Sequence, residues 1–141
     1  MSAAKKNIAV FVLGGLLYGL IEILWRSYTH WTMLITGGIC LLLLYNLYTK
    51  HSQLNLPLKC LLGACIITAV EFCVGCIVNL WLGMNVWDYS ALPFNIYGQV
   101  CLLFSCMWLF ISGLAVPLCS MLDKLLSNIK WGSETKEISD L

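Results

Sequence analysis

Charged residues are scarce in this sequence, and their scarcity sets its class. Only 11% of the 141 residues are charged, whereas 60% are hydrophobic. Because an ordinary soluble domain carries about a quarter charged residues, this composition indicates a membrane protein. The net charge is +1 and there is no basic patch, which argues against nucleic acid as a partner.

The sequence also lacks the motifs of the common enzyme and cofactor classes. It has no Walker A sequence, nucleophile elbow, HExxH motif or dinucleotide fingerprint. His30 and His51 are expected on opposite faces of the membrane, so they cannot share a site. We therefore predict a protein that is not an enzyme and needs no cofactor. A weaker alternative, a lipid-modifying enzyme with Glu71 or Asp88 as base, has no paired nucleophile.

The cysteines do not predict a metal site or a disulfide framework. All eight lie in or beside apolar segments, where cysteine packs as a small hydrophobic residue. Cys73 and Cys76 form a C-x-x-C, but no second pair and no histidine lies nearby. Zinc sites usually need four such ligands, so we expect no metal.

Four long apolar runs are present, and each is long enough to cross a bilayer, which takes about 20 residues. The expected spans are about 8–25, 32–49, 58–82 and 94–116. Since lipid cannot satisfy backbone polar groups, the spans must be helices, and residues 1–117 form an all-α transmembrane domain. No small-residue cleavage site follows the first run, so we expect it to be retained.

The distribution of positive residues predicts how the chain is oriented. Seven lysines lie before the first span, between the second and third, or after the fourth, whereas Arg26 alone lies on the other side. The positive-inside rule then places both termini in the cytoplasm. After Pro117, an apolar stripe predicts an amphipathic helix over 118–131, either on the inner leaflet or continuing the fourth span. Residues 132–141 are expected to be a flexible polar tail.

An internal repeat is suggested by two similar stretches. Residues 19–31 and 75–87 both match G-x-I-x-x-L-W-x5-W. A true repeat would make the protein two tandem helical hairpins, as in transporter folds that bind ligands near the repeat interface. The alternative is that tryptophan recurs because it is enriched at membrane surfaces.

Charged side chains within or near the spans are the first candidate site residues. Glu71 falls near the middle of the third span, where a charge costs about 2.5–3.5 kcal/mol. It either contacts an ion, a proton or a substrate amine, or it joins helices through buried hydrogen bonds. Glu22 and Arg26, spaced i, i+4, form either a local ion pair or an outer vestibule with His30 and Asp88.

Amide side chains extend this candidate site. Asn95 and Gln99 are expected on the first turns of a fourth helix that starts at Pro93. With Glu71 and Asn79 they would form a polar stripe between the third and fourth helices, which either binds a polar ligand or bridges the helices.

Small residues are available for close helix packing. Gly15 and Gly19 form a GxxxG in the first span, and Gly37, Gly38 and Gly75 are expected to serve the later spans similarly. Because four helices can hardly enclose a pathway alone, we expect a homo-oligomer or a partner membrane subunit.

One block of residues resembles a known family. It combines an acidic residue in a helix with G-x-I-x-N-x-x-x-G and then VWDYS-x-x-P-x-N-x-x-G-Q. The positions are Glu71, Gly75, Ile77, Asn79, Gly83, Val86, Trp87, Asp88, Tyr89, Ser90, Pro93, Asn95, Gly98 and Gln99. On these residues the chain resembles the CmpB-type ABC-transporter permeases. The resemblance implies an integral protein of the bacterial cytoplasmic membrane, whose ATPase subunit would be a separate chain.

We therefore predict a small membrane transport component with a substrate or ion site at Glu71, Asn79, Asp88, Asn95 and Gln99. Asp88 or Ser90 would also cap the outer ends of the third and fourth helices. The alternative is a non-transporting scaffold or regulatory subunit, in which these side chains join the helices by hydrogen bonds.

Overall fold

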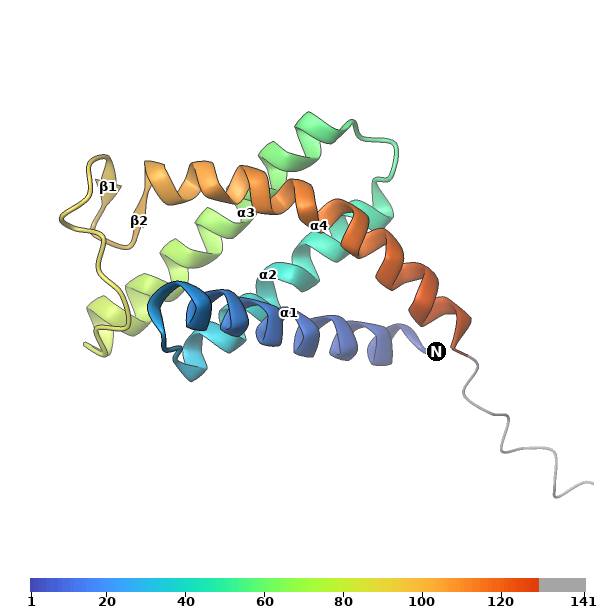
Figure 1. Cartoon of the computed structure of the whole chain (residues 1–141), viewed down its shortest axis with the longest axis horizontal. Helices are drawn as coiled ribbons and strands as arrows, with labels where there is room; N and C mark the ends of the chain where they lie inside the picture. The colour runs from blue at the N-terminus through green and yellow to red at the C-terminus, as the bar shows by residue number, and fades with distance from the viewer. Residues whose placement is uncertain (130–141) are drawn as a thin grey trace, which may run out of the picture.

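The computed structural model describes residues 1–129, which form four long helices and one very short hairpin (Figure 1). The helices are α1 (Ala3–Arg26), α2 (Trp31–Lys50), α3 (Leu56–Gly75), the π-helix η1 (Cys76–Trp81) and α4 (Leu102–Asn128). Strands β1 (Asn95–Ile96) and β2 (Val100–Cys101) pair antiparallel. α1, α2, α3 with η1, and α4 are each long and apolar enough to cross a membrane. The prediction of a four-span α-helical membrane protein is therefore confirmed.

Side-chain caps define where the first three helices begin. Ser2 accepts a hydrogen bond from the backbone N–H of Lys5, and Asn55 accepts one from the N–H of Leu58. His30 caps α2 through its Nδ1, which accepts from the N–H of Thr32 at 3.3 Å. Such caps satisfy N–H groups that have no partner within the helix. α1, α2, and α3 together with η1 lie where the first three spans were expected, and η1 ends at Trp81.

The predicted start of the fourth span at residue 94 is wrong. Pro93 does not open a helix, and α4 begins only at Leu102. Phe94, Tyr97 and Gly98 have φ values of 54°, 51° and 69°, which a right-handed helix excludes. The intervening residues 82–101, here named the junction segment, instead form turns and the β1–β2 hairpin.

At its other end, α4 runs through Pro117 to Asn128 without a break. Residues 118–128 of the predicted amphipathic helix thus continue α4, which is one of the two alternatives that the sequence left open. The second half of the helix turns away from the first in Figure 1, as an internal proline favours. Lys130, Trp131 and the predicted polar tail at 132–141 lie outside the described residues.

Glycines allow α1 and α2 to pack closely. A Cβ added at Gly15 would lie 2.7 Å from the backbone oxygen of Leu34, and one at Gly14 would lie 2.6 Å from the oxygen of Gly37. Helices in lipid associate through such close packing, because lipid gives no hydrophobic drive between them. α3 packs mainly against α4, so the bundle consists of two helix pairs.

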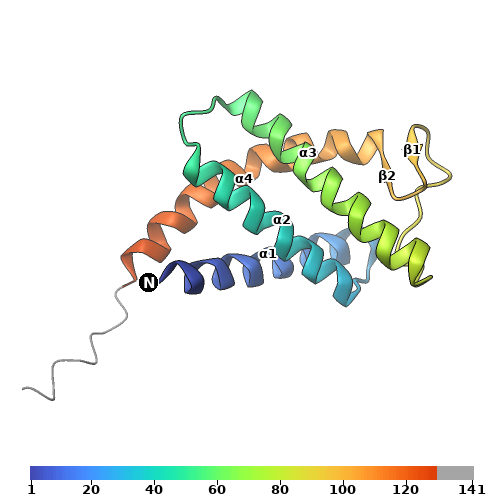
Figure 2. The ribbon, with the colours of Figure 1, turned by 180° about the vertical axis from the view of Figure 1, so that it is seen from behind.

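The bundle has two distinct ends (Figures 1 and 2). The junction end carries the junction segment and the α1–α2 connection. The tail end carries the start of α1, the α2–α3 connection and the end of α4. There the Nζ of Lys6 donates a hydrogen bond to the Oγ of Ser127 at 2.7 Å, which joins the first helix to the last.

Candidate functional site

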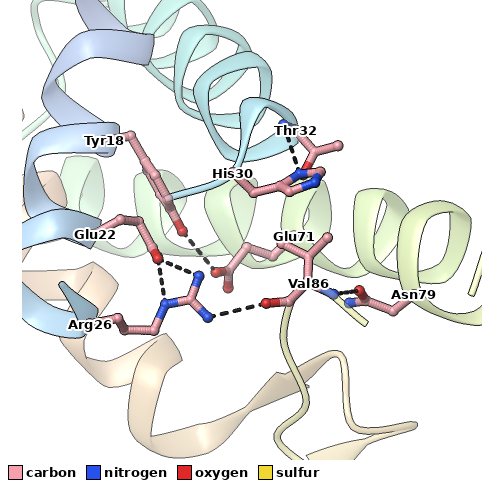
Figure 3. Close-up of polar contacts among 8 residues, drawn as sticks. All are labelled: Tyr18, Glu22, Arg26, His30, Thr32, Glu71, Asn79 and Val86. Atoms are coloured by element: carbon pink, nitrogen blue, oxygen red, sulfur yellow. Dashed lines mark hydrogen bonds and ion pairs between the residues drawn. The ribbon is translucent and has the colours of Figure 1, made fainter. Parts of the chain in front are cut away.

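A buried carboxylate, Glu71, is bonded by side chains from two other helices. Its side chain lies on α3, and the residue is only 1% exposed. The indole Nε1 of Trp108 on α4 donates to Glu71 Oε2 at 2.9 Å. The hydroxyl of Tyr18 on α1 donates to Oε1 at 3.4 Å (Figure 3). Both donors are neutral, and no basic side chain within residues 1–129 forms an ion pair with Glu71.

The two donors of Glu71 also line a cavity of about 270 Å³ between the helices. The remaining walls are almost wholly aliphatic and come from all four long helices, Leu41, Ile67 and Ala115 among them. The rings of Tyr18 and Trp108 lie 6.0 Å apart between centroids. A group held in this cavity would therefore lie against the two side chains that bond Glu71.

Near the junction end, Glu22 and Arg26 form an ion pair on α1. The carboxylate Oε2 of Glu22 lies 2.5 Å from Nη2 of Arg26 and 2.6 Å from its Nε. Arg26 Nη1 also donates to the backbone oxygen of Val86 at 3.2 Å (Figure 3). The ion pair thus anchors the junction segment to α1.

An amide pair continues this network into η1 and the junction segment. Asn79 donates from Nδ2 to Gln99 Oε1 at 2.8 Å, and its Oδ1 accepts from the N–H of Val86 at 2.7 Å. The indole of Trp87 donates to the backbone oxygen of Gln99 at 2.9 Å. Gly75 makes room for this pair, since a Cβ there would lie 2.6 Å from Gln99 Oε1.

The remaining polar residues of the junction segment bond within it. Asp88 Oδ1 accepts from the N–H of Ser90 at 2.8 Å, and Asn95 Oδ1 accepts from the N–H of Gly98 at 3.0 Å. The Ser90 hydroxyl, and then the Ser90 N–H, hold the pKa of Asp88 below its ordinary value. Gly98 has φ +69°, and a Cβ there would lie 2.8 Å from Asp88 Oδ1, so this turn favours glycine.

These contacts change the predicted site. Asn95 and Gln99 do not lie on the first turns of a helix, because α4 begins after them. The expected stripe of four side chains is therefore not formed on two facing helices: Asn79 meets Gln99, whereas Asn95 bonds to the backbone of its own loop. Asp88 accepts from its own turn, and α4 starts without a side-chain cap.

The four residues expected at an outer vestibule do not hydrogen-bond as one group. Glu22 and Arg26 pair with each other, whereas His30 caps α2 and Asp88 closes a turn of the junction segment.

Tyr18 and Trp108 were not among the partners expected for Glu71 from the sequence. Their positions in the sequence do indicate such a role, because both lie inside spans and not at the membrane boundaries where aromatic residues are enriched. A buried indole N–H or phenol usually needs a hydrogen-bond partner. An acid on a neighbouring span is a natural acceptor.

No metal centre is evident in the part of the chain that the structure describes. Within residues 1–129, no group of three histidine, cysteine or acidic side chains lies close enough to hold an ion. The eight cysteines are free thiols, and several of them face outward from the bundle.

The four apolar helices define a multi-pass membrane protein. A family model described as "Putative ABC-transporter type IV" matches residues 9–136. The chain belongs to this family, which confirms the CmpB-type resemblance and indicates a transport component that works with other membrane-transport subunits. No curated protein and no solved structure matches the chain.

Proposed function

We propose that the protein is a small transport component whose ionisable site is Glu71. The observation that carries this proposal is a carboxyl group almost wholly buried between three helices, with two neutral donors and no ion-pair partner among residues 1–129. An uncompensated charge within a bilayer is costly, so such residues generally mark an ion, proton or substrate pathway.

The chemistry of the site favours a positive ligand. Tyr18 donates to the carboxylate through its hydroxyl, and Trp108 can only donate, so neither supplies the missing positive charge. A proton, a small cation or a protonated amine would supply it. The cavity of about 270 Å³ beside these two aromatic side chains offers an approach to the carboxylate. Asn79 and Gln99 then support the site by fixing the junction segment over this half of the bundle.

The proposal includes an orientation in the membrane of a bacterial cell. Lys5, Lys6, Lys50, Lys59 and Lys124 all belong to helix ends or turns at the tail end. By the positive-inside rule, this end faces the cytoplasm, with both termini inside. A separate ATPase subunit would therefore bind at the tail end, and a second copy or another membrane subunit would complete the pathway. Residues 1–117 form the transmembrane domain in this arrangement, and residues 118–128 continue α4 toward the cytoplasm.

The direct test compares the wild type with Glu71→Gln in detergent. Thermal unfolding is measured across pH and a panel of monovalent cations and small amines. We expect the wild type to show a ligand-dependent or pH-dependent shift in melting temperature that Glu71→Gln lacks. Glu22→Gln is the matched control, since it also removes a carboxylate but from the ion pair near the junction end.

The opposite result would count against a binding role for Glu71. The carboxylate is structural if neither a ligand nor a change of pH shifts the melting temperature of the wild type, and if Glu71→Gln melts lower than the wild type by the same amount at every pH. A shift that is retained in Glu71→Gln but lost in Glu22→Gln would move the site to the ion pair.

A scaffold or regulatory subunit is the second candidate, and one observation favours it. The hydrogen bonds of Glu71 join α1, α3 and α4, as a purely structural buried polar group would. Glu71→Gln and Glu71→Leu distinguish the candidates. Under the scaffold model, glutamine preserves assembly and cellular function while leucine disrupts folding. Under the transport model, glutamine folds but abolishes transport.

A further inference from the structure

A polar cavity at the tail end is not used by the proposed transport site. It has a volume of about 480 Å³ and lies between the end of α2, the α2–α3 connection, the start of α3 and the second half of α4. Its walls include the ammonium-bearing side chains of Lys59 and Lys124, together with Thr49, Ser52, Ser120 and Asp123. The cavity beside Glu71, by contrast, has almost wholly apolar walls.

Lys59 is the central feature of this cavity. The residue is only 9% exposed, and its Nζ donates one hydrogen bond, to the backbone oxygen of Ser52 at 3.2 Å. It forms no ion pair with any residue in the range 1–129. An ammonium has three donors, and burying a charge without an opposite charge is costly. The site is therefore incomplete with respect to negative charge.

The acidic residue in the cavity does not supply that charge to Lys59. Asp123 Oδ1 accepts from the hydroxyl of Tyr45 at 2.7 Å and lies 3.8 Å from Nζ of Lys6. Its charge is thus shared with Tyr45 on α2 and Lys6 on α1. Two lysines remain in the cavity, and the hydroxyls of Ser52 and Ser120 make no hydrogen bond within the described residues.

We propose that this cavity binds a phosphate group. Lysine ammonium groups and hydroxyl donors together suit phosphate oxygens, and the first turn of α3, where Lys59 lies, adds the positive end of a helix dipole. Basic pockets between spans at the cytoplasmic side bind the head groups of anionic lipids. The phosphate therefore comes either from such a lipid or from a soluble phosphate. This inference is independent of the role proposed for Glu71.

The two sources are tested on the purified full-length protein. Native mass spectrometry measures the retention of anionic phosphatidylglycerol against phosphatidylcholine, whose phosphate is neutralised by its own choline group. Thermal unfolding measures stabilisation by inorganic phosphate against chloride at equal ionic strength. We expect at least one phosphate probe to bind better than its control. Lys124→Gln and Lys59→Gln should each weaken that binding about tenfold, as the loss of a charge-assisted hydrogen bond predicts.

Lys50→Gln is the matched control, because Lys50 lies exposed at the same end of the bundle but does not line the cavity. It should bind the probe as well as the wild type. Lys124→Gln decides the outcome if Lys59→Gln fails to fold, since Lys124 is exposed. The proposal is overturned if neither phosphate probe binds better than its control. It is also overturned if every cavity variant that folds binds the probe like the wild type, or if Lys50→Gln loses as much binding as the cavity variants do.

A response to phosphatidylglycerol alone identifies a lipid head group as the ligand. A response to inorganic phosphate alone identifies a soluble phosphate. Either result supports the phosphate site.

Discussion

Replacing Asn79 with alanine should destabilise the protein by about 2–4 kcal/mol, from two buried groups left unpaired at about 1–2 kcal/mol each. The groups are the N–H of Val86 and the Oε1 of Gln99, and both residues are buried, at 6% and 3% exposure. Asn79→Asp keeps the acceptor for Val86 but places a buried carboxylate oxygen against Gln99 Oε1, so it should cost at least as much.

The assay is reversible unfolding in mixed detergent micelles, followed by tryptophan fluorescence. Asn46→Ala provides the control, since Asn46 Nδ2 donates only to the backbone oxygen of Leu42 in its own helix, at 2.8 Å. We expect the control to cost less than about 1 kcal/mol, because this local bond joins no second element. Equal losses at Asn79 and Asn46 would refute the view that the amide pair fixes the junction segment.

Two further predictions concern close-packed glycines, and a third concerns the pKa of Asp88. Gly75→Ala should destabilise by about 1–3 kcal/mol through overpacking, because the new Cβ would lie 2.6 Å from Gln99 Oε1; chemical unfolding measures this, and a neutral result would contradict it. Gly15→Ala should also destabilise the protein by about 1–3 kcal/mol, because the new Cβ meets the backbone of Leu34 and α1 must move away from α2. A chemical cross-link between α1 and α2 should then form less readily than in the wild type. The pKa of Asp88 is lowered in the folded protein, so its contribution to stability is complete above the ordinary aspartate pKa and is lost as the pH falls through the folded value. Hydrogen exchange in the junction segment should therefore rise only in acid, and Asp88→Asn should remove this pH dependence.

The helical spans could be predicted because composition alone determines them. A run of uncharged residues long enough to cross a bilayer has few stable alternatives to a helix. The same reasoning placed Glu71 inside the third span, whereas its burial comes from the packing of α1 and α4 against α3.

The junction segment could not be predicted by the same means. Residues 94–101 carry no charge and lead directly into the apolar span that follows, so the absence of charge does not separate the two. The separation comes from positive φ angles at Phe94, Tyr97 and Gly98 and from hydrogen bonds to η1, which lies about 20 residues earlier in the chain. The i, i+4 spacing of Asn95 and Gln99 resembles a helical face, but in the structure it spans a hairpin.

The two stretches of the suggested internal repeat place their tryptophans in different environments. Trp25 and Trp81 are 68% and 79% exposed at the ends of their helices, as expected for residues at a membrane surface. Trp31 and Trp87, the final residues of the two stretches, are not equivalent. Trp31 is 59% exposed, whereas Trp87 is 6% exposed and donates to the backbone of Gln99. Surface enrichment explains the first pair but not Trp87, whose burial depends on the junction segment.

The two polar clusters can therefore be assigned different tasks. In the Asn79–Gln99 cluster, the side-chain bonds run to neutral protein groups, so the cluster meets its own hydrogen-bonding needs and requires no ligand. Glu71 has donors for both oxygens but no ion-pair partner among the described residues, so the charge of an ionised Glu71 would be unbalanced. Because hydrogen bonds from neutral groups cannot cancel a net charge, only the second cluster has a physical reason to attract a cation. Variants of the amide pair should accordingly change stability while leaving any ligand response intact, whereas Glu71→Gln should remove the response at little cost in stability.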